Sequence, residues 1–500
     1  RDCSCGRVRM RREPWQPSFK DKAMEEAGDT LALFLEPEAL EALAWVSHSW
    51  TIPSSLYDWE GRCQEDFGAV CLQYVRFLEL GETRGANSCW RSLYMRLHRF
   101  HRGLRDPGWL QHRLREKWCQ APSISLKQAS CRFLQGGHAA VFRGHADTVQ
   151  VRAIASPAEQ TGSPWQYSFR PSKFLDVVPV AAQEIVGISL ALELEKWSFK
   201  DQEVCYCRAP SGLREEDAAE DLRLFVEHVA DKLFLIAGTM IQAFSLADLE
   251  LSYVLSVPGS RGEQILARWD YGEAFLAYQE EGRAVQVYRS CDGECLGQID
   301  SALQVLCCDI THIAYAGEKT KLASILETDG GIRIFVHATN EWHLLEAIET
   351  VSLVVEVKLE RELLMAVSHS ESGEEGKLHV WHVHFCSGDA RLDGKEATCL
   401  RNYCCRNFSQ PPDRVEGRHG GKFIEVFFLP TTKHSPIDGV YSIEWLEPMK
   451  LQPLLKLQRC IGDWRCDLRD AVAVLESQTD ETDEVIIRWQ FLWQPLPHQG

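Results

Sequence analysis

The sequence predicts an α+β multidomain protein, in which a small all-α module is followed by an all-β propeller of seven blades. Three observations lead to this prediction: the chain length, helical spacing of apolar residues near the beginning, and β-rich text that returns at regular intervals. The 500 residues, 45% of them apolar, exceed what one hydrophobic core usually organises. We divide the chain into a tail (1–23), a helical module with linker helices (24–118), a loop-rich connector placed to contribute one closing strand (119–172), and the propeller (173–500).

Helical spacing is clearest in "PEALEALAWVSHSW", where Leu40, Leu43 and Val46 fall on nearly one face. Pro37 stands in the first turn, where the missing N–H of proline costs nothing. Further helices are expected within 58–80 and within 89–106, where apolar residues again recur every three or four positions. One short helix cannot bury this apolar face by itself, so the face must pack against other helices of the module or against a partner.

A sequence pattern recurs after residue 173. It consists of a strand in which apolar and polar residues alternate, an aromatic residue at the end of that strand, and then a polar turn. The closing aromatics are separated by 44, 47, 46, 64 and 44 residues, and they are Phe244, Tyr288, Phe335, Trp381, Trp445 and Trp489. A weaker candidate, Trp197, stands 47 residues before the first of them. About 40–45 residues per unit is the length of a four-stranded propeller blade. The open alternative is an antiparallel sandwich whose strands are evenly spaced, and in either fold we expect these aromatics to be buried.

The interval of 64 residues between Trp381 and Trp445 contains the segment 387–421. We expect this segment to be a long loop on one face of the propeller. Its basic side chains suit an acidic or phosphorylated segment of a protein partner, through guanidinium contacts; they are Arg401, Arg406, Arg414 and Arg418. The alternative left open is a surface loop without a partner.

Composition limits the classes of function. The formal net charge is −18, and the acidity lies after residue 120, so nucleic acid is not an expected partner, because its binding depends on cations that neutralise phosphates. No apolar run approaches the ~20 residues of a membrane span. The 19 cysteines show no paired CxxC spacing of a zinc site. We therefore expect no membrane, a cytoplasmic or nuclear location, and no metal.

Catalytic motifs are not found in the sequence. The stretch "GGHAAVFRGH" is rich in glycine but lacks the Lys-Ser/Thr ending of a phosphate loop, and neither Gly-x-Ser-x-Gly nor His-Glu-x-x-His occurs. We expect no enzymatic activity, no catalytic residue and no cofactor. A propeller hydrolase or lyase, with side chains converging from several blades, stays open as an alternative.

The N-terminal text resembles the F-box family over residues 24–104. The resemblance rests on a leucine run with a proline, "VSHSW", and a later Trp followed by Cys, here Leu35, Pro37, Leu40, Leu43, Val46, Ser47, Trp50, Trp59 and Cys63. It implies docking to the Skp adaptor of a cullin-RING ubiquitin ligase through Leu35, Pro37, Leu40, Leu43, Val46 and Trp50. One departure is "AMEEAGDTLALFL", which is polar and contains Gly28 where the family has Leu-Pro and two leucines.

The recurring units resemble WD repeats, with the closing aromatic at the position of that motif's tryptophan and "FRGHADTV" similar to its Gly-His element. Together the two resemblances imply a substrate-recognition subunit of a Skp-cullin-F-box ubiquitin ligase. In this interpretation the F-box docks the adaptor and cullin, and the propeller binds a protein substrate. The alternative is a non-catalytic propeller scaffold for protein interactions with a relic F-box.

Overall fold

Antiparallel β-hairpins build most of the protein, as a computed structural model shows. The structure describes residues 58–68, separate positions between 71 and 105, and the strands with many of their turns between 119 and 491. Side chains are described within 58–105 and 175–456. The described residues are mostly in β-sheet, and the few helical ones among them lie at the N-terminal side.

Six sheets of four antiparallel strands follow the chain order, and we number them I to VI. Sheet I holds β2 (Ala129–Phe133), β3 (Ala139–Gly144), β4 (Val149–Ala153) and β5 (Gln166–Phe169). Sheet II holds β6 (Phe174–Ala181), β7 (Glu184–Ser189), β8 (Leu194–Ser198) and β9 (Glu203–Arg208). Sheet III holds β10 (Arg223–Glu227), β11 (Lys232–Ala237), β12 (Met240–Ser245) and β13 (Leu251–Ser256).

The next three sheets continue the same order. Sheet IV holds β14 (Ile265–Trp269), β15 (Ala274–Gln279), β16 (Ala284–Arg289) and β17 (Cys295–Asp300). Sheet V holds β18 (Val305–Tyr315), β19 (Glu318–Glu327), β20 (Ile332–Ala338) and β21 (Glu341–Ile348). Sheet VI holds β22 (Leu353–Glu360), β23 (Leu363–His369), β24 (Gly376–Phe385) and β25 (Thr398–Phe408).

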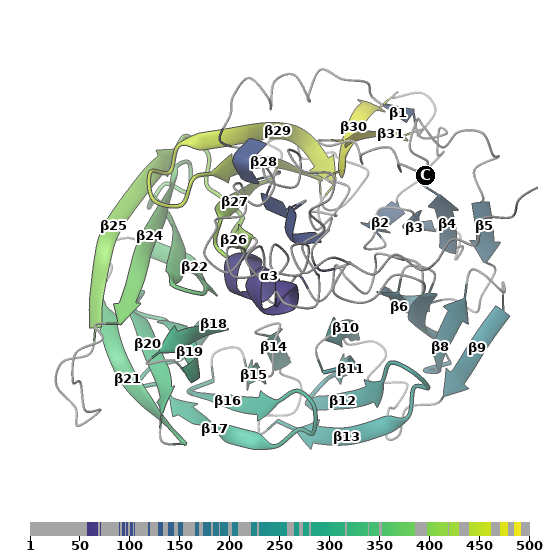
Figure 1. The fold of residues 1–500 in the computed structure, drawn as a ribbon, viewed down its shortest axis with the longest axis horizontal. Helices are drawn as coiled ribbons and strands as arrows, with labels where there is room; N and C mark the ends of the chain where they lie inside the picture. The colour runs from purple at the N-terminus through teal and green to yellow at the C-terminus, as the bar shows by residue number, and fades with distance from the viewer. Residues whose placement is uncertain are drawn as a thin grey trace, which may run out of the picture.

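Sheet VII has seven strands and joins the two ends of the β-rich region. It holds β26 (Arg414–Arg418), β27 (Phe423–Phe428), β28 (Val440–Leu446), β29 (Pro453–Ile461), β30 (Ala471–Gln478), β31 (Val485–Phe491) and β1 (Cys119–Gln120). The short strand β1 pairs antiparallel with β31, and Cys119 lies opposite Trp489. The sheets are set around a common centre, with the first strand of each nearest the centre and the fourth at the rim (Figure 1).

The recurring aromatics occupy equivalent positions, as the sequence predicted. Trp197, Phe244, Tyr288, Phe335 and Trp381 each lie in the third strand of a four-stranded sheet. At each of these residues the pairing of the third with the fourth strand shifts register, which marks a β-bulge. The repeat therefore records one backbone irregularity, made at the same place in successive sheets.

Burial of these aromatics is confirmed for most of them. Phe244, Tyr288, Trp381 and Trp445 are between 1% and 8% exposed, whereas Trp197 and Phe335 are half-buried. The side chain of Trp489 lies outside the described residues. Each buried ring removes a large apolar surface from water, so these positions serve the core.

The hydrophobic core lies between neighbouring sheets. Each cluster of buried side chains draws on two successive sheets: Leu322 and Ile334 of sheet V pack with Val357 and Leu364 of sheet VI. The next cluster joins sheets VI and VII in the same way, and others join II to III, III to IV and IV to V. Several second strands are largely apolar because both of their faces are covered, as in β27, where every residue is buried, Glu425 included.

Carboxylates tie the first strands of successive sheets together. Asp176 of β6 accepts a hydrogen bond from the Leu224 N–H of β10 at 2.8 Å, and Asp309 of β18 accepts one from the Leu359 N–H of β22 at 2.9 Å. Glu356 of β22 repeats the contact with β26, accepting from the next first strand at 2.8 Å. A bond from a backbone N–H to a charged acceptor is stronger than one between neutral groups, so the ties help to hold the order of the sheets.

Two sequence predictions need correction. The segment 119–172, expected to be rich in loops, contains β1 and the four strands of sheet I. The third strand of sheet I has the sequence "VQVRA" and no aromatic residue at its end. The regular spacing of aromatic residues therefore did not indicate sheet I. The segment 387–421 is not one long loop, because β25 and β26 lie inside it.

The helices expected within 58–80 and 89–106 are shorter or only partly described. The helix α3 (Trp59–Phe67) ends at Gly68, although the chain is helical again at Cys71. Helical residues follow at Trp90 and between 93 and 103. The first expected helix, with its leucine face, lies outside the described residues. In the part of the chain that the structure describes, no helix is long and apolar enough to cross a membrane.

Candidate functional site

The helix α3 begins and ends on local signals in its sequence. The Asp58 carboxylate accepts a hydrogen bond from the Gly61 N–H at 2.9 Å and caps the N-terminus. Trp59, Cys63 and Phe67 follow at intervals of four and are at most 2% exposed, so they form one apolar face. Gly68, with φ 85°, closes the helix by donating its N–H to the Gln64 carbonyl at 3.0 Å.

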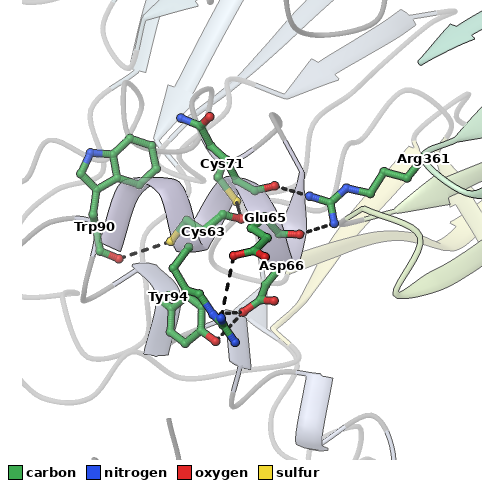
Figure 2. A network of polar contacts seen from close by, with 9 residues as sticks. Cys63, Glu65, Asp66, Cys71, Trp90, Tyr94 and Arg361 are labelled. Atoms are coloured by element: carbon green, nitrogen blue, oxygen red, sulfur yellow. Dashed lines mark hydrogen bonds and ion pairs between the residues drawn. The ribbon is translucent and has the colours of Figure 1, made fainter. Parts of the chain in front are cut away.

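The apolar face of α3 packs on the helical residues around Tyr94, which is 1% exposed. The Tyr94 ring lies 5.4 Å from both Trp59 and Phe67, and its hydroxyl donates to Asp66 at 2.6 Å. The Cys63 thiol donates to the carbonyl of Trp90 (Figure 2). Burial and the bond to Asp66 raise the pKa of Tyr94. We call α3 and the helical residues from 71 to 103 the helical unit.

Arg361 attaches the helical unit to the sheets. It lies in the turn between β22 and β23 with φ 53°, which places a non-glycine residue in the left-handed region. Its guanidinium donates to the carbonyls of Gln64 and Glu65, at the C-terminal end of α3 (Figure 2). Carbonyls at the end of a helix are short of backbone partners, although that of Gln64 also accepts from the Gly68 N–H. The negative end of the helix dipole favours a cation there. The side chain therefore serves both as a cap and as a link.

The turn between β26 and β27 makes the second attachment. Gly420, with φ 65°, brings its backbone so close to the helix that a Cβ there would lie 3.0 Å from the carbonyl carbon of Phe67. The ring of His101 stacks on Phe67 at 5.3 Å and lies 5.9 Å from the Phe423 ring of β27. We call α3 with these two turns the junction.

A cavity of about 1030 Å³ opens at the junction. Its lining includes residues of the helical unit, of the β22–β23 and β26–β27 turns, and of the segment 447–454, which runs from the end of β28 into the beginning of β29. Most of its lining side chains are charged or polar, while Pro448, Met449, Pro453 and Leu454 form an apolar wall.

Two titratable groups of the cavity have shifted pKa values. Desolvation raises the pKa of Glu360 to about 7, and the neighbouring Arg361 opposes this shift. Burial lowers the pKa of Lys422, to which Arg361 and Arg105 add by repulsion while Asp66 opposes them. The charges of Arg361 and Arg105 therefore lie near that of Lys422 in the lining of the cavity.

The arginines expected to bind a partner are held by carboxylates of their own chain. Arg406 pairs with Glu444 at 2.9 Å and also donates to the carbonyl of Leu451. Arg418 pairs with Glu425 at 2.6 Å and with Glu416 at 2.8 Å.

Arg414 lies over the ring of Phe427, 4.1 Å from its centroid, and 3.7 Å from Glu416. The side chain of Arg401, in β25, lies outside the described residues. The three described arginines make these contacts within sheets VI and VII, and the binding of a partner by the four arginines stays a prediction.

The residues expected to bind an adaptor all lie outside the described residues; they are Leu35, Pro37, Leu40, Leu43, Val46 and Trp50. Sequence reasoning missed the residues of the junction, namely Arg361, Gly420 and Lys422. Their only local signal is the Gly-Gly pair at 420–421, which is typical of a turn with positive φ.

One hydrogen-bonded chain has catalytic residue types. The Ser368 hydroxyl lies 2.9 Å from His379 Nε2, and His379 Nδ1 lies 2.9 Å from the Tyr403 hydroxyl. Ser368 is 1% exposed, and burial lowers the pKa of His379 to about 4. These hydrogen bonds link β23, β24 and β25. Among the described residues, no group of three or more His, Cys, Asp or Glu side chains is placed to hold a metal ion.

Comparisons with known proteins give little to add. No protein-family model matches the sequence, and no curated protein matches it. Among solved structures, the chain is similar to the crystal structure of the computationally designed Ika8 protein, with a TM-score of 0.44 and 9% sequence identity, covering 74% of this chain and 98% of that one. A likeness at this level supports no statement about function.

Proposed function

We propose that the sheets are the blades of a β-propeller. Support comes from the four-stranded antiparallel units, the aromatic at the same bulge in successive sheets, and the arrangement around a common centre (Figure 1). The pairing of β1 with β31 joins the two ends of the β-rich region within one sheet, as a ring fold requires. Sheet VII carries two of the aromatics, Trp445 in β28 and Trp489 in β31. Counted as two blades beside the six four-stranded sheets, it gives a ring of eight blades rather than the seven expected from the sequence.

On this ring we propose the function of a substrate-recognition subunit of a Skp-cullin-F-box ubiquitin ligase. The F-box-like segment docks the adaptor through Leu35, Pro37, Leu40, Leu43, Val46 and Trp50, and the propeller binds a protein substrate. Transfer chemistry belongs to other subunits, in a cytoplasmic or nuclear location. Loops on a rigid ring suit recognition because they diverge without loss of the fold.

The observation that carries this proposal is the attachment of α3 to two sheet turns, through Arg361 and the close approach of Gly420. A substrate receptor must hold its adaptor-binding end at a fixed place relative to its substrate-binding end. A helical unit joined to the sheets only by a linker would not meet that need.

The second candidate is a propeller scaffold with a relic F-box, favoured by the polar text "MEEAGDT" where the family has leucines. It keeps the protein interactions and drops the ligase. Both candidates predict the same sheets and the same junction, so adaptor binding separates them.

The deciding experiment measures binding of a purified Skp adaptor to the full chain. Leu40→Asp and Leu43→Asp place an unpaired charge in an apolar face, which costs several kcal/mol, so each should abolish binding while the sheets stay folded. Leu344→Asp, on a residue of β21 that is 57% exposed, is the matched control and should bind normally. Absence of adaptor binding to the wild-type chain favours the scaffold, and normal binding of both variants assigns those leucines to an internal core.

A further inference from the structure

Charged side chains of both signs line the cavity at the junction, namely four carboxylates and four Lys or Arg side chains. Glu447 lies 3.7 Å from Lys450, and Glu362 lies 3.1 Å from His382, which carries a charge only when it is protonated. A third carboxylate, Glu65, lies 3.8 Å from Arg62. The fourth is Glu360, and its raised pKa of about 7 leaves it only partly charged at neutral pH.

The other three cations of the lining lie near one another. Arg361 gives its guanidinium to backbone carbonyls, which carry no net charge. Arg105 and Lys422 also line the cavity, and neither forms an ion pair with a carboxylate among the residues that the structure describes. Repulsion from Arg361 and Arg105 helps to lower the pKa of Lys422, while attraction to Asp66 opposes it. An anion placed among the three cations would relieve this repulsion.

The three cations come from separate parts of the chain. Arg105 follows the helical unit, Arg361 lies between β22 and β23, and Lys422 lies between β26 and β27. The segment 447–454 adds apolar residues to the lining, among them Met449, which is 39% exposed. The cavity thus offers both cationic and apolar groups to a single ligand.

We propose that this cavity binds a small organic phosphate, with its phosphates among Arg105, Arg361 and Lys422 and its organic part against the Met449 wall. Guanidinium groups suit phosphate because their planar N–H donors match its oxygens, and lysine adds a point charge. The volume of about 1030 Å³ accommodates a ligand of several hundred daltons.

A ligand held there contacts the helical unit and two sheets at once. By binding the docked arrangement and not the separated one, it stabilises the junction by linkage. The proposal concerns the junction and does not depend on the ligase function, since a scaffold with the same fold would bind the same ligand.

The test uses isothermal titration of the full chain with three probes: ATP, inorganic tripolyphosphate and adenosine. We expect ATP to bind, tripolyphosphate to bind several-fold more weakly, and adenosine to give no measurable heat. Lys422→Glu and Arg105→Glu should each weaken ATP binding at least tenfold. The matched control is Arg283→Glu, an exposed arginine before β16 in sheet IV, which should leave the affinity unchanged.

Circular dichroism melting checks that the variants are folded, and Lys422→Gln, which removes the charge without reversing it, gives a second test in case the Glu variant unfolds. No ATP binding at millimolar concentration, or binding that is unchanged in every Lys422 and Arg105 variant, would overturn the proposal. Equal affinities for ATP and tripolyphosphate would contradict the apolar half of the site. A site that takes a singly phosphorylated peptide and rejects ATP would also contradict it.

Discussion

The contacts between sheets and the contacts at the junction are built on different physical terms. Neighbouring sheets share apolar clusters of a dozen or so side chains, so the loss of one residue leaves most of the interface in place. The junction depends on Arg361, on the backbone at Gly420 and on a short stack of aromatic rings. Redundant burial makes a core robust, whereas a polar contact between two turns and a helix end depends on single residues. It follows from this difference that the stability of the sheets and the position of the helical unit can be changed by separate substitutions.

The largest expected effect is a loss of stability when the core between the sheets is disrupted. Trp445 of β28 is 1% exposed, and its ring N–H donates to Glu425 at 2.9 Å. Trp445→Ala should lower the free energy of unfolding by about 3–5 kcal/mol, because it leaves a cavity and removes the donor to one oxygen of Glu425. Urea denaturation followed by fluorescence measures the change. A loss below about 1 kcal/mol would mean that the ring is not part of the core.

The next largest effect is expected from a substitution that disrupts the junction. Gly420→Ala puts a Cβ at 3.0 Å from Phe67 and forces alanine to φ 65°, which costs about 1–3 kcal/mol. Hydrogen exchange of α3 should rise while that of β23 stays unchanged.

Gly373→Ala is the matched control for this variant, because Gly373 has φ 69° but nothing within 4 Å of the added Cβ. It should share the backbone strain and leave the exchange of α3 unaltered. Equal exchange of α3 in the two variants would show that Gly420 does not position the helix.

A smaller loss is expected for Arg361→Ala. It removes the donors to Gln64 and Glu65, and losing hydrogen bonds made by a charged group costs about 1.5–3 kcal/mol, reduced here by solvent. Arg361→Lys keeps the charge but loses the planar fork, so it should recover only part of the protection of α3. Full protection in both variants would contradict the role of Arg361 as a link.

The smallest effect is a dependence of stability on pH. The pKa of Glu360 is raised from 4.5 to about 7 in the folded protein, so the native state holds this proton more tightly than the unfolded state does. The contribution of Glu360 is fully present below pH 4.5 and is lost as the pH rises through 7. Glu360→Gln, which imitates the neutral carboxyl, should flatten the fall in urea midpoint between pH 5 and pH 8. An unchanged slope would show that another group causes the fall.

Part of the fold could be predicted from the sequence because a single residue type marks it. An aromatic at the bulge of the third strand repeats every 44 to 47 residues in most sheets, and this spacing is visible without structure. Sheet I was missed because β4 lacks the aromatic. The strand β25 was interpreted as loop because its text, "TCLRNYCCRNF", is polar on an outer strand of its sheet.

The junction could not be predicted, for a different reason. Arg361 and Gln64 are 297 residues apart in the chain, and nothing in either local sequence indicates the other. The basic residues of 387–421 were visible, but the carboxylates that hold Arg406 and Arg418 come from β27 and β28. Pairing of this kind depends on the register of strands, which a single sequence does not supply.

The central claim, that the helical unit and the sheets form one body, is tested most directly by hydrogen exchange of the wild-type chain under native conditions. The helix α3 has nine residues, which is too short to be stable in water alone. If the junction holds it, the amides from Cys63 to Phe67 should be protected to within about tenfold of those in β23 and β27. Exchange of α3 at the rate of an unstructured peptide, with both strands still protected, would contradict the account.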